Sequence, residues 1–137
     1  MSRIPRYQEH LKTGFTAEAV SAARCRAYAA RADQDGRPNL ARHWQRLATE
    51  KDALAVKLLE AAEQVRGEAA DGSDIATAVS EERYENDVLY PKMIRDVDQA
   101  TGNILLEVLE AQKAHLKHLE DLREALTSST GDVAAPV

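Results

Sequence analysis

The chain has 137 residues, 44% of them hydrophobic and 30% charged, a composition that is ordinary for one soluble globular domain. Its net charge of −5 comes from basic and acidic residues interleaved along the chain, which argues against a nucleic-acid partner or an anionic membrane surface. The single cysteine, Cys25, excludes an intrachain disulfide framework and a Cys-x-x-Cys metal site, and the lack of a long apolar run argues against a bilayer span and favours a cytoplasmic location.

Helix-forming residues dominate, and there are only six glycines and four prolines, so the sequence predicts an all-α fold. Turn residues divide the chain into four helical stretches: Gly36 and Pro38 end one helix and permit the next, and residues 67–74 form a longer loop. Pro91 lies inside the third stretch and lacks a backbone N–H, so it is expected to bend or split that helix at Tyr90. The expected helices span about residues 16–31, 38–66, 74–100 and 103–126.

The lengths of the connections predict how these helices pair. Short first and third connections favour antiparallel hairpins, and the longer middle connection leaves room for a crossover between two hairpins, which is the outline of a four-helix bundle. We therefore expect a lead-in over residues 1–12, a bundle over residues 13–126, and a disordered tail over residues 127–137, whose side chains are small, polar and unpatterned.

Two carboxylates stand on the core-facing stripe of the third helix. Glu82 and Glu85 share the three- and four-residue spacing of Ile75, Ala78 and Leu89, which places these side chains on one helix face. Burying a carboxylate without a compensating charge or proton costs on the order of several kcal/mol. The sequence therefore predicts a cation beside this pair.

The other helices also carry polar groups at mid-height on their inner faces. The stripe of the second helix runs through Leu40, Trp44, Leu47, Lys51, Leu54 and Leu58. If two hairpins pack side by side, the polar groups converge, and carboxylate oxygens with an imidazole nitrogen suit iron or manganese. The candidate metal ligands are Glu18, Glu82, Glu85 and His115, and the candidate lining residues are Lys51, Gln112, Leu54 and Tyr90.

Two sets of residues carry a family resemblance. Glu82-x-x-Glu85 followed by Tyr90-Pro91 is similar to the Glu-x-x-Glu and Tyr-Pro segment of rubrerythrin-like members of the ferritin-like superfamily. The first helix and turn resemble the same family at Leu11, Lys12, Phe15, Glu18, Arg24, Tyr28, Ala29, Ala32 and Gly36. The resemblance implies a ferritin-like bundle, a di-iron centre associated with peroxide reduction, Glu18 as a metal ligand, and electrons delivered through a rubredoxin domain that is not found in this chain.

The sequence departs from that family at two ligand positions. The Glu-x-x-His motif of the second helix falls on Lys51 and Leu54, and a one-residue slip would start it at Glu50 instead. Lys51 is preferred as the inward residue because it keeps the phase of the apolar stripe. In the fourth helix only His115 of the motif remains, since Gln112 replaces the glutamate. A lysine among carboxylates takes over the charge of one cation, so a full di-iron centre is not expected.

Two functions stay open on the sequence. In the first, the protein is a rubrerythrin-like oxidoreductase whose four candidate ligands bind a single iron or manganese ion that reduces peroxide or oxygen, with electrons from an external donor protein. In the second, it is a non-catalytic ferritin-like scaffold or binding module whose metal site is replaced by a salt-bridge network between Lys51 and the carboxylates. Either form is expected to self-associate as a homodimer, without a nucleic-acid or membrane partner.

Overall fold

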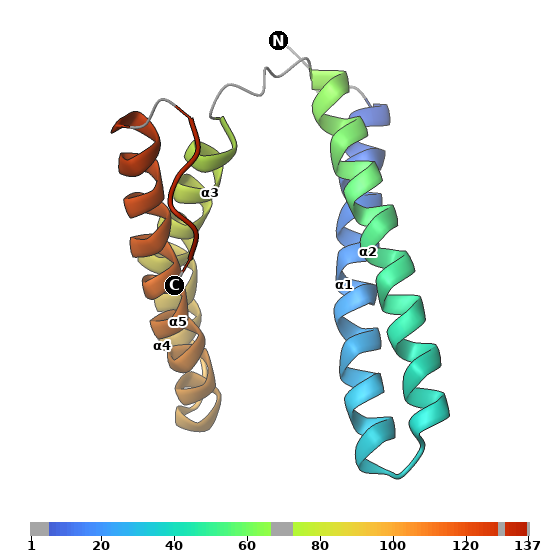
Figure 1. Cartoon of the computed structure of the whole chain (residues 1–137). Helices are drawn as coiled ribbons and strands as arrows, with labels where there is room; N and C mark the ends of the chain where they lie inside the picture. The colour runs from blue at the N-terminus through green and yellow to red at the C-terminus, as the bar shows by residue number, and fades with distance from the viewer. Residues whose placement is uncertain (1–5, 67–72, 129–130, 137) are drawn as a thin grey trace. The chain divides into compact units, whose positions relative to one another are not determined.

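The computed structural model of the chain describes residues 6–66, 73–128 and 131–136 (Figure 1). These residues confirm the all-α class, because they form helices joined by turns, and the long helices pack in pairs, consistent with a four-helix bundle. The chain divides into two compact units, Met1–Glu68 and Ala69–Val137. The elements are α1 (Arg6–Gln34), α2 (Pro38–Arg66), α3 (Ser73–Tyr84), the π-helix η1 (Glu85–Leu89), α4 (Tyr90–Arg95) and α5 (Gln99–Ser128).

The first unit is a hairpin of α1 and α2 whose core consists mainly of alanine. In α2, Ala41, Ala48, Ala55 and Ala62 recur every seven residues, and each is buried. A seven-residue repeat keeps one face of a helix against its partner over many turns. The buried apolar residues of α1 are equally small, and they are Ala22, Cys25, Ala29 and Ala32. Small side chains at the contact allow the two helix axes to approach closely.

This alanine core differs from the core that the sequence pattern predicts for α2. The pattern places Leu40, Leu47 and Leu54 in the core, but within the hairpin these side chains are 40%, 41% and 48% exposed. The alanines one position further along occupy the contact with α1, because a close helix contact has room only for small groups. The three leucines therefore lie along the flank of the hairpin.

The closed end of this hairpin combines a glycine turn with aromatic packing. Gly36 has a φ of 75°, a left-handed conformation that a residue without Cβ adopts at no steric cost. The rings of Tyr28 and Trp44 meet edge to face with their centroids 5.0 Å apart. Trp44 also packs against a buried cluster formed by Ala29, Ala32 and Ala41. These contacts hold the first turn of α2 against the last turns of α1.

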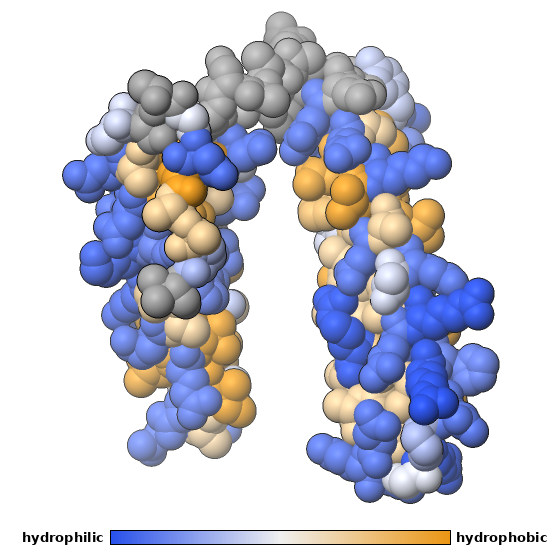
Figure 2. All heavy atoms as spheres, viewed as in Figure 1, coloured by the Kyte–Doolittle hydropathy of each residue, from blue (hydrophilic) through white to orange (hydrophobic). Residues whose placement is uncertain are grey.

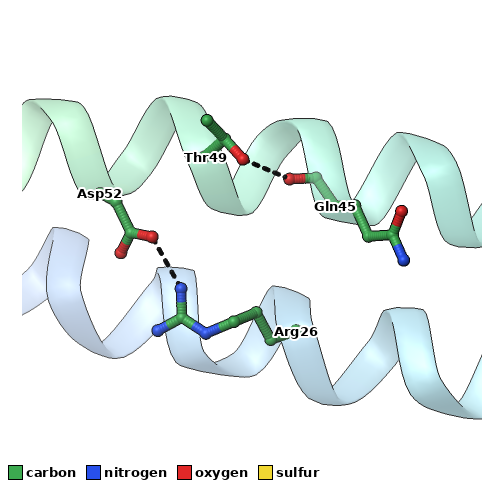
Figure 3. A network of polar contacts seen from close by, with 4 residues as sticks. All are labelled: Arg26, Gln45, Thr49 and Asp52. Carbon is green, nitrogen blue, oxygen red and sulfur yellow. Dashed lines mark hydrogen bonds and ion pairs between the residues drawn. The ribbon is translucent and has the colours of Figure 1, made fainter. Parts of the chain in front are cut away.

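Polar contacts line the edge of the same hairpin (Figure 3). Arg26 Nη1 on α1 donates to Asp52 Oδ2 on α2 at 2.7 Å, while within α2 the Thr49 hydroxyl donates to the Gln45 carbonyl oxygen at 3.1 Å. The ion pair is about half exposed on both sides, so its contribution to stability is small. It marks the register of α1 against α2.

The second unit packs α5 against the consecutive segments α3, η1 and α4. Val79 and Leu109 are the most deeply buried large apolar residues among those described in this unit, at 1% and 5% exposure. The stripe that the sequence predicts for the third helix is half-buried throughout, at Ile75, Ala78, Glu82, Glu85 and Leu89. The carboxylate-bearing face therefore borders the core of this unit.

The helix interruption predicted near Pro91 takes the form of a π-helical turn. The Tyr90 N–H bonds to the Glu85 carbonyl oxygen, five residues earlier, and Pro91 lies in the first turn of α4. A proline is tolerated in a first turn, where its missing N–H would have no intrahelical partner. Single π-turns inside α-helices occur frequently at functional sites. Here the turn begins at Glu85, one of the candidate ligands.

Several helix boundaries differ from the prediction. The turn before the last helix lies at residues 96–98, and residues 101–103 are already part of α5. α1 begins at Arg6, inside the predicted lead-in, and its early residue Gln8 is buried. α5 continues to Ser128, into the predicted tail, while residues 131–136 form neither helix nor strand. The predicted loop lies outside the described residues except for positions 73 and 74, which begin α3. In the part of the chain that is described, no helix has an apolar stretch long enough to cross a membrane.

Candidate functional site

In the first unit, one candidate ligand is already paired with a cationic side chain. Lys51 Nζ on α2 donates to Glu18 Oε2 on α1 at 3.1 Å, and both side chains are about 70% or more buried, with exposures of 30% and 26%. Of the ion pairs in the described residues, this one is the least exposed. Screening by water is weaker here than for an exposed pair, so the attraction is correspondingly stronger.

The structure also shows which of the two candidate inward residues of the second helix, Lys51 or Glu50, faces the first helix. Lys51 lies on the side of α2 that faces α1, whereas Glu50 is exposed and pairs with Arg46 one turn earlier on the same helix. Lys51 stands seven residues after Trp44 and so follows the seven-residue repeat of α2, in which the nearby Ala48 and Ala55 are buried. The predicted lining residue Leu54 is 48% exposed and follows Lys51 by one turn.

In the second unit, a neutral amide satisfies another candidate ligand. Gln112 Nε2 on α5 donates to Glu85 Oε1 at 2.9 Å, and the Gln112 main-chain oxygen accepts a bond from Asn86 Nδ2 at 3.3 Å. The two bonds tie the start of the π-turn to the middle of α5. Gln112 thus holds this carboxylate by hydrogen bonding.

Glu82 is the candidate ligand that lacks such a partner. Its Oε2 atom is buried and has no hydrogen-bond donor among the described residues. Burial raises the pKa of Glu82 above its ordinary value of 4.5, and the charges of Glu85 and Glu81 raise it further, while His115 opposes them. His115 itself is exposed on α5, at the edge of the inner stripe. Glu82, Glu85 and His115 are therefore electrostatic neighbours within one unit.

Asn86 is a site residue that the sequence pattern did not single out. It is 5% exposed, and its Oδ1 atom is buried without a donor among the described residues. Asn86 follows the buried Val79 by seven residues, so a heptad count along the third helix would have placed this amide in the core. The predicted lining residue Tyr90 is half-buried one residue beyond the π-turn.

The structure thus describes the candidate residues in two groups. Glu18 and Lys51 lie in the first unit, and Glu82, Glu85, Gln112 and His115 lie in the second. Within either unit, the described histidine, cysteine, aspartate and glutamate residues include no group of three arranged to hold a metal ion. What each group offers by itself is an internal ion pair or hydrogen bond.

No protein-family model matches this chain, and no curated protein matches it. The class that the structure defines is an all-α protein of paired helices with polar groups at mid-height.

Proposed function

We propose that the protein is a non-catalytic ferritin-like scaffold or binding module in which protein side chains occupy the positions of a former metal centre. The observation that carries the proposal is the Lys51–Glu18 ion pair, 3.1 Å long and largely buried between α1 and α2. An ammonium in this place supplies the positive charge that a divalent ion would supply beside a carboxylate. The amide of Gln112 satisfies Glu85 in the second unit in a comparable way.

An iron or manganese centre fits these residues poorly. A metal ion at Glu18 would have to displace Lys51 or accept its positive charge as a close neighbour, which is unfavourable in a poorly hydrated place. A metal ion at Glu85 would have to break the hydrogen bond from Gln112. Two of the four candidate ligands thus have protein partners, and this supports the scaffold over a loaded metal centre.

Metal analysis tests the proposal directly. The full chain is purified after growth with added iron and manganese, and its bound metal is measured by mass spectrometry. We expect less than about a tenth of an equivalent of either metal per chain, because Lys51 already neutralises Glu18 and Gln112 already bonds Glu85. About one equivalent, retained through gel filtration, would refute the proposal.

A charge reversal at Lys51 tests whether this lysine is what excludes the metal. Lys51→Glu removes the ammonium and adds a carboxylate, so metal uptake should rise at least about tenfold. Lys57→Glu is the matched control, because it makes the same change at an exposed position of α2 and should leave uptake unchanged. Unchanged uptake in a folded Lys51→Glu protein would contradict the assigned role of the lysine.

One observation favours a second candidate function, a metal-dependent oxidoreductase with a single ion. Glu82 Oε2 is buried without a donor, and His115 lies near enough to lower the pKa of Glu82. A carboxylate and an imidazole are ligands that iron and manganese accept. For this candidate, the same measurement should find about one equivalent of metal in the unaltered chain, and Glu82→Gln should abolish it.

A further inference from the structure

The closed end of the α1–α2 hairpin has a hollow that its own packing does not fill. The volume of this hollow is about 300 Å³, which is at the lower end of the range for small-molecule sites. Residues from the end of α1, the turn and the start of α2 line it, and they include Tyr28, Arg31, Asp35, Arg37, Leu40 and Trp44. Figure 2 shows hydrophobic and hydrophilic residues side by side at this end of the hairpin, the lower end in the view.

Two aromatic rings and a leucine form the apolar wall of the hollow. The rings of Tyr28 and Trp44 are inclined by 66° and meet edge to face, so they are not stacked on each other. Both aromatic residues are only half-buried, and Leu40 is 40% exposed. Because the packing of the hairpin leaves part of this wall uncovered, a flat apolar group can lie against it and remove apolar surface from water.

Arg31 and Arg37 give the same hollow an excess of positive charge. The Arg31 guanidinium lies over the Tyr28 ring, with its Cζ atom 5.5 Å from the ring centroid. A stacked guanidinium still presents N–H donors at its edge. Among the described residues, neither arginine side chain has an ion pair or a hydrogen bond. The only carboxylate in the lining is that of Asp35, so two positive charges face one negative charge.

We propose that this hollow binds a small aromatic carboxylate. The ring of the ligand lies against Trp44 and Leu40, and its carboxylate accepts hydrogen bonds from the two guanidinium groups, whose planar N–H forks match a pair of carboxylate oxygens. A neutral aromatic molecule would leave the arginines unused, and a bare anion would leave the apolar wall in water. The site includes neither Lys51 nor Glu18, so it goes beyond the scaffold proposed above.

The tryptophan of the hollow provides the measurement. Trp44 is the only tryptophan of the chain, so its indole N–H gives a single side-chain signal in a nitrogen-correlated NMR spectrum of the full chain. The probe is cinnamate, a planar aromatic carboxylate. We expect a saturable shift of the Trp44 signal with a Kd of about 1 mM or lower, as suits a small ligand in a hollow of this size.

Three further probes test the two parts of the ligand separately. Cinnamamide keeps the ring without the charge, whereas acetate and inorganic phosphate keep a charge without the ring, and each should bind at least about tenfold more weakly than cinnamate. Cinnamamide that binds as tightly as cinnamate would overturn the role of the arginines. Acetate or phosphate that binds as tightly would overturn the aromatic class of the ligand. A Trp44 signal that does not move with cinnamate up to about 10 mM would overturn the site itself.

Substitutions of opposite sign locate the carboxylate. Arg37→Gln removes one fork and should raise the Kd for cinnamate at least about fivefold, whereas Asp35→Asn removes the opposing charge and should lower it about twofold. Arg42→Gln is the matched control, because Arg42 is an exposed residue of α2 outside the lining, and it should leave the Kd unchanged. Equal effects of the two arginine substitutions would contradict the proposal. None of these outcomes bears on the metal content, so the scaffold and this site can fail separately.

Discussion

The unpaired oxygen of Glu82 gives the sharpest prediction about stability. Glu82→Met removes a half-buried carboxylate and fills its place with an unbranched side chain that suits a helix. A buried acceptor without a donor costs about 1–3 kcal/mol, and because Glu82 is only half-buried we expect the free energy of unfolding to rise by about 1 kcal/mol. For a chain of this size that gain raises the Tm by roughly 3–5 °C.

The effect depends on pH in a direction that the pKa shift fixes. The pKa of Glu82 is raised in the folded protein, chiefly by burial and then by Glu85, so the folded state binds this proton more tightly than the unfolded state does. As the pH falls through the folded pKa towards 4.5, protonation therefore relieves the cost of the charge in the unaltered protein. The advantage of Glu82→Met should be full at pH 7 and should shrink through this window.

Thermal unfolding followed by circular dichroism between pH 4 and pH 7.5 measures both effects. Glu107→Met, on the exposed side of α5, is the matched control and should change the free energy of unfolding by less than about 0.5 kcal/mol. A loss of about 1 kcal/mol or more at pH 7 in Glu82→Met would refute the reasoning, because the carboxylate would then have a stabilising partner in the folded protein.

Two further predictions concern the hairpins. Ala48→Leu overfills the buried contact between α1 and α2 and should lower the free energy of unfolding, measured by urea titration, by about 1–3 kcal/mol. Ala53→Leu, on the exposed side of α2, is the control and should be close to neutral. Equal losses in the two variants would contradict the alanine core. Asp98 precedes α5 and accepts the Thr101 N–H at 2.9 Å, and bonds from Thr101 lower the pKa of Asp98 below 3.8. Asp98→Ala should therefore lower the Tm at pH 7, and this effect should disappear as the pH falls through the lowered pKa. Asp96→Ala is the control, and an effect that does not change with pH would refute the capping role of Asp98.

The helices could be predicted from the sequence because their signals are local. Gly36 and Pro38 mark the turn between α1 and α2, and Pro91 marks the interruption that becomes the π-turn. The core of α2 could not be predicted in the same way. Both the leucine at position 47 and the alanine at position 48 fit a heptad stripe, and only the distance between α1 and α2 decides which of them faces inward.

The residues of the candidate site could be predicted from the sequence, but the side chains that they bond could not. Helical phase places Lys51 on the inner side, and the structure adds that it bonds Glu18. For Glu85 the partner depends on the rotamer of Gln112 and on the π-turn, neither of which has a sequence period. Asn86 was not predicted because the expected cation site was defined by carboxylates and an imidazole, although the seven-residue spacing from Val79 indicates a buried position.

The internal partners of the carboxylates differ in charge. Because of this difference, the behaviour of Glu82 distinguishes between the two candidate functions. Lys51 neutralises Glu18, whereas Gln112 satisfies Glu85 without neutralising it. The second unit therefore keeps two carboxylates side by side, at Glu82 and Glu85, with His115 as the opposing group. A cation that entered the protein would be attracted to Glu82 and Glu85 first, because the negative charge of this pair is balanced less by its neighbours than that of Glu18. If Glu82→Met stabilises the chain, the scaffold accounts for the site; if it destabilises the chain, an occupant of positive charge must be sought beside Glu82.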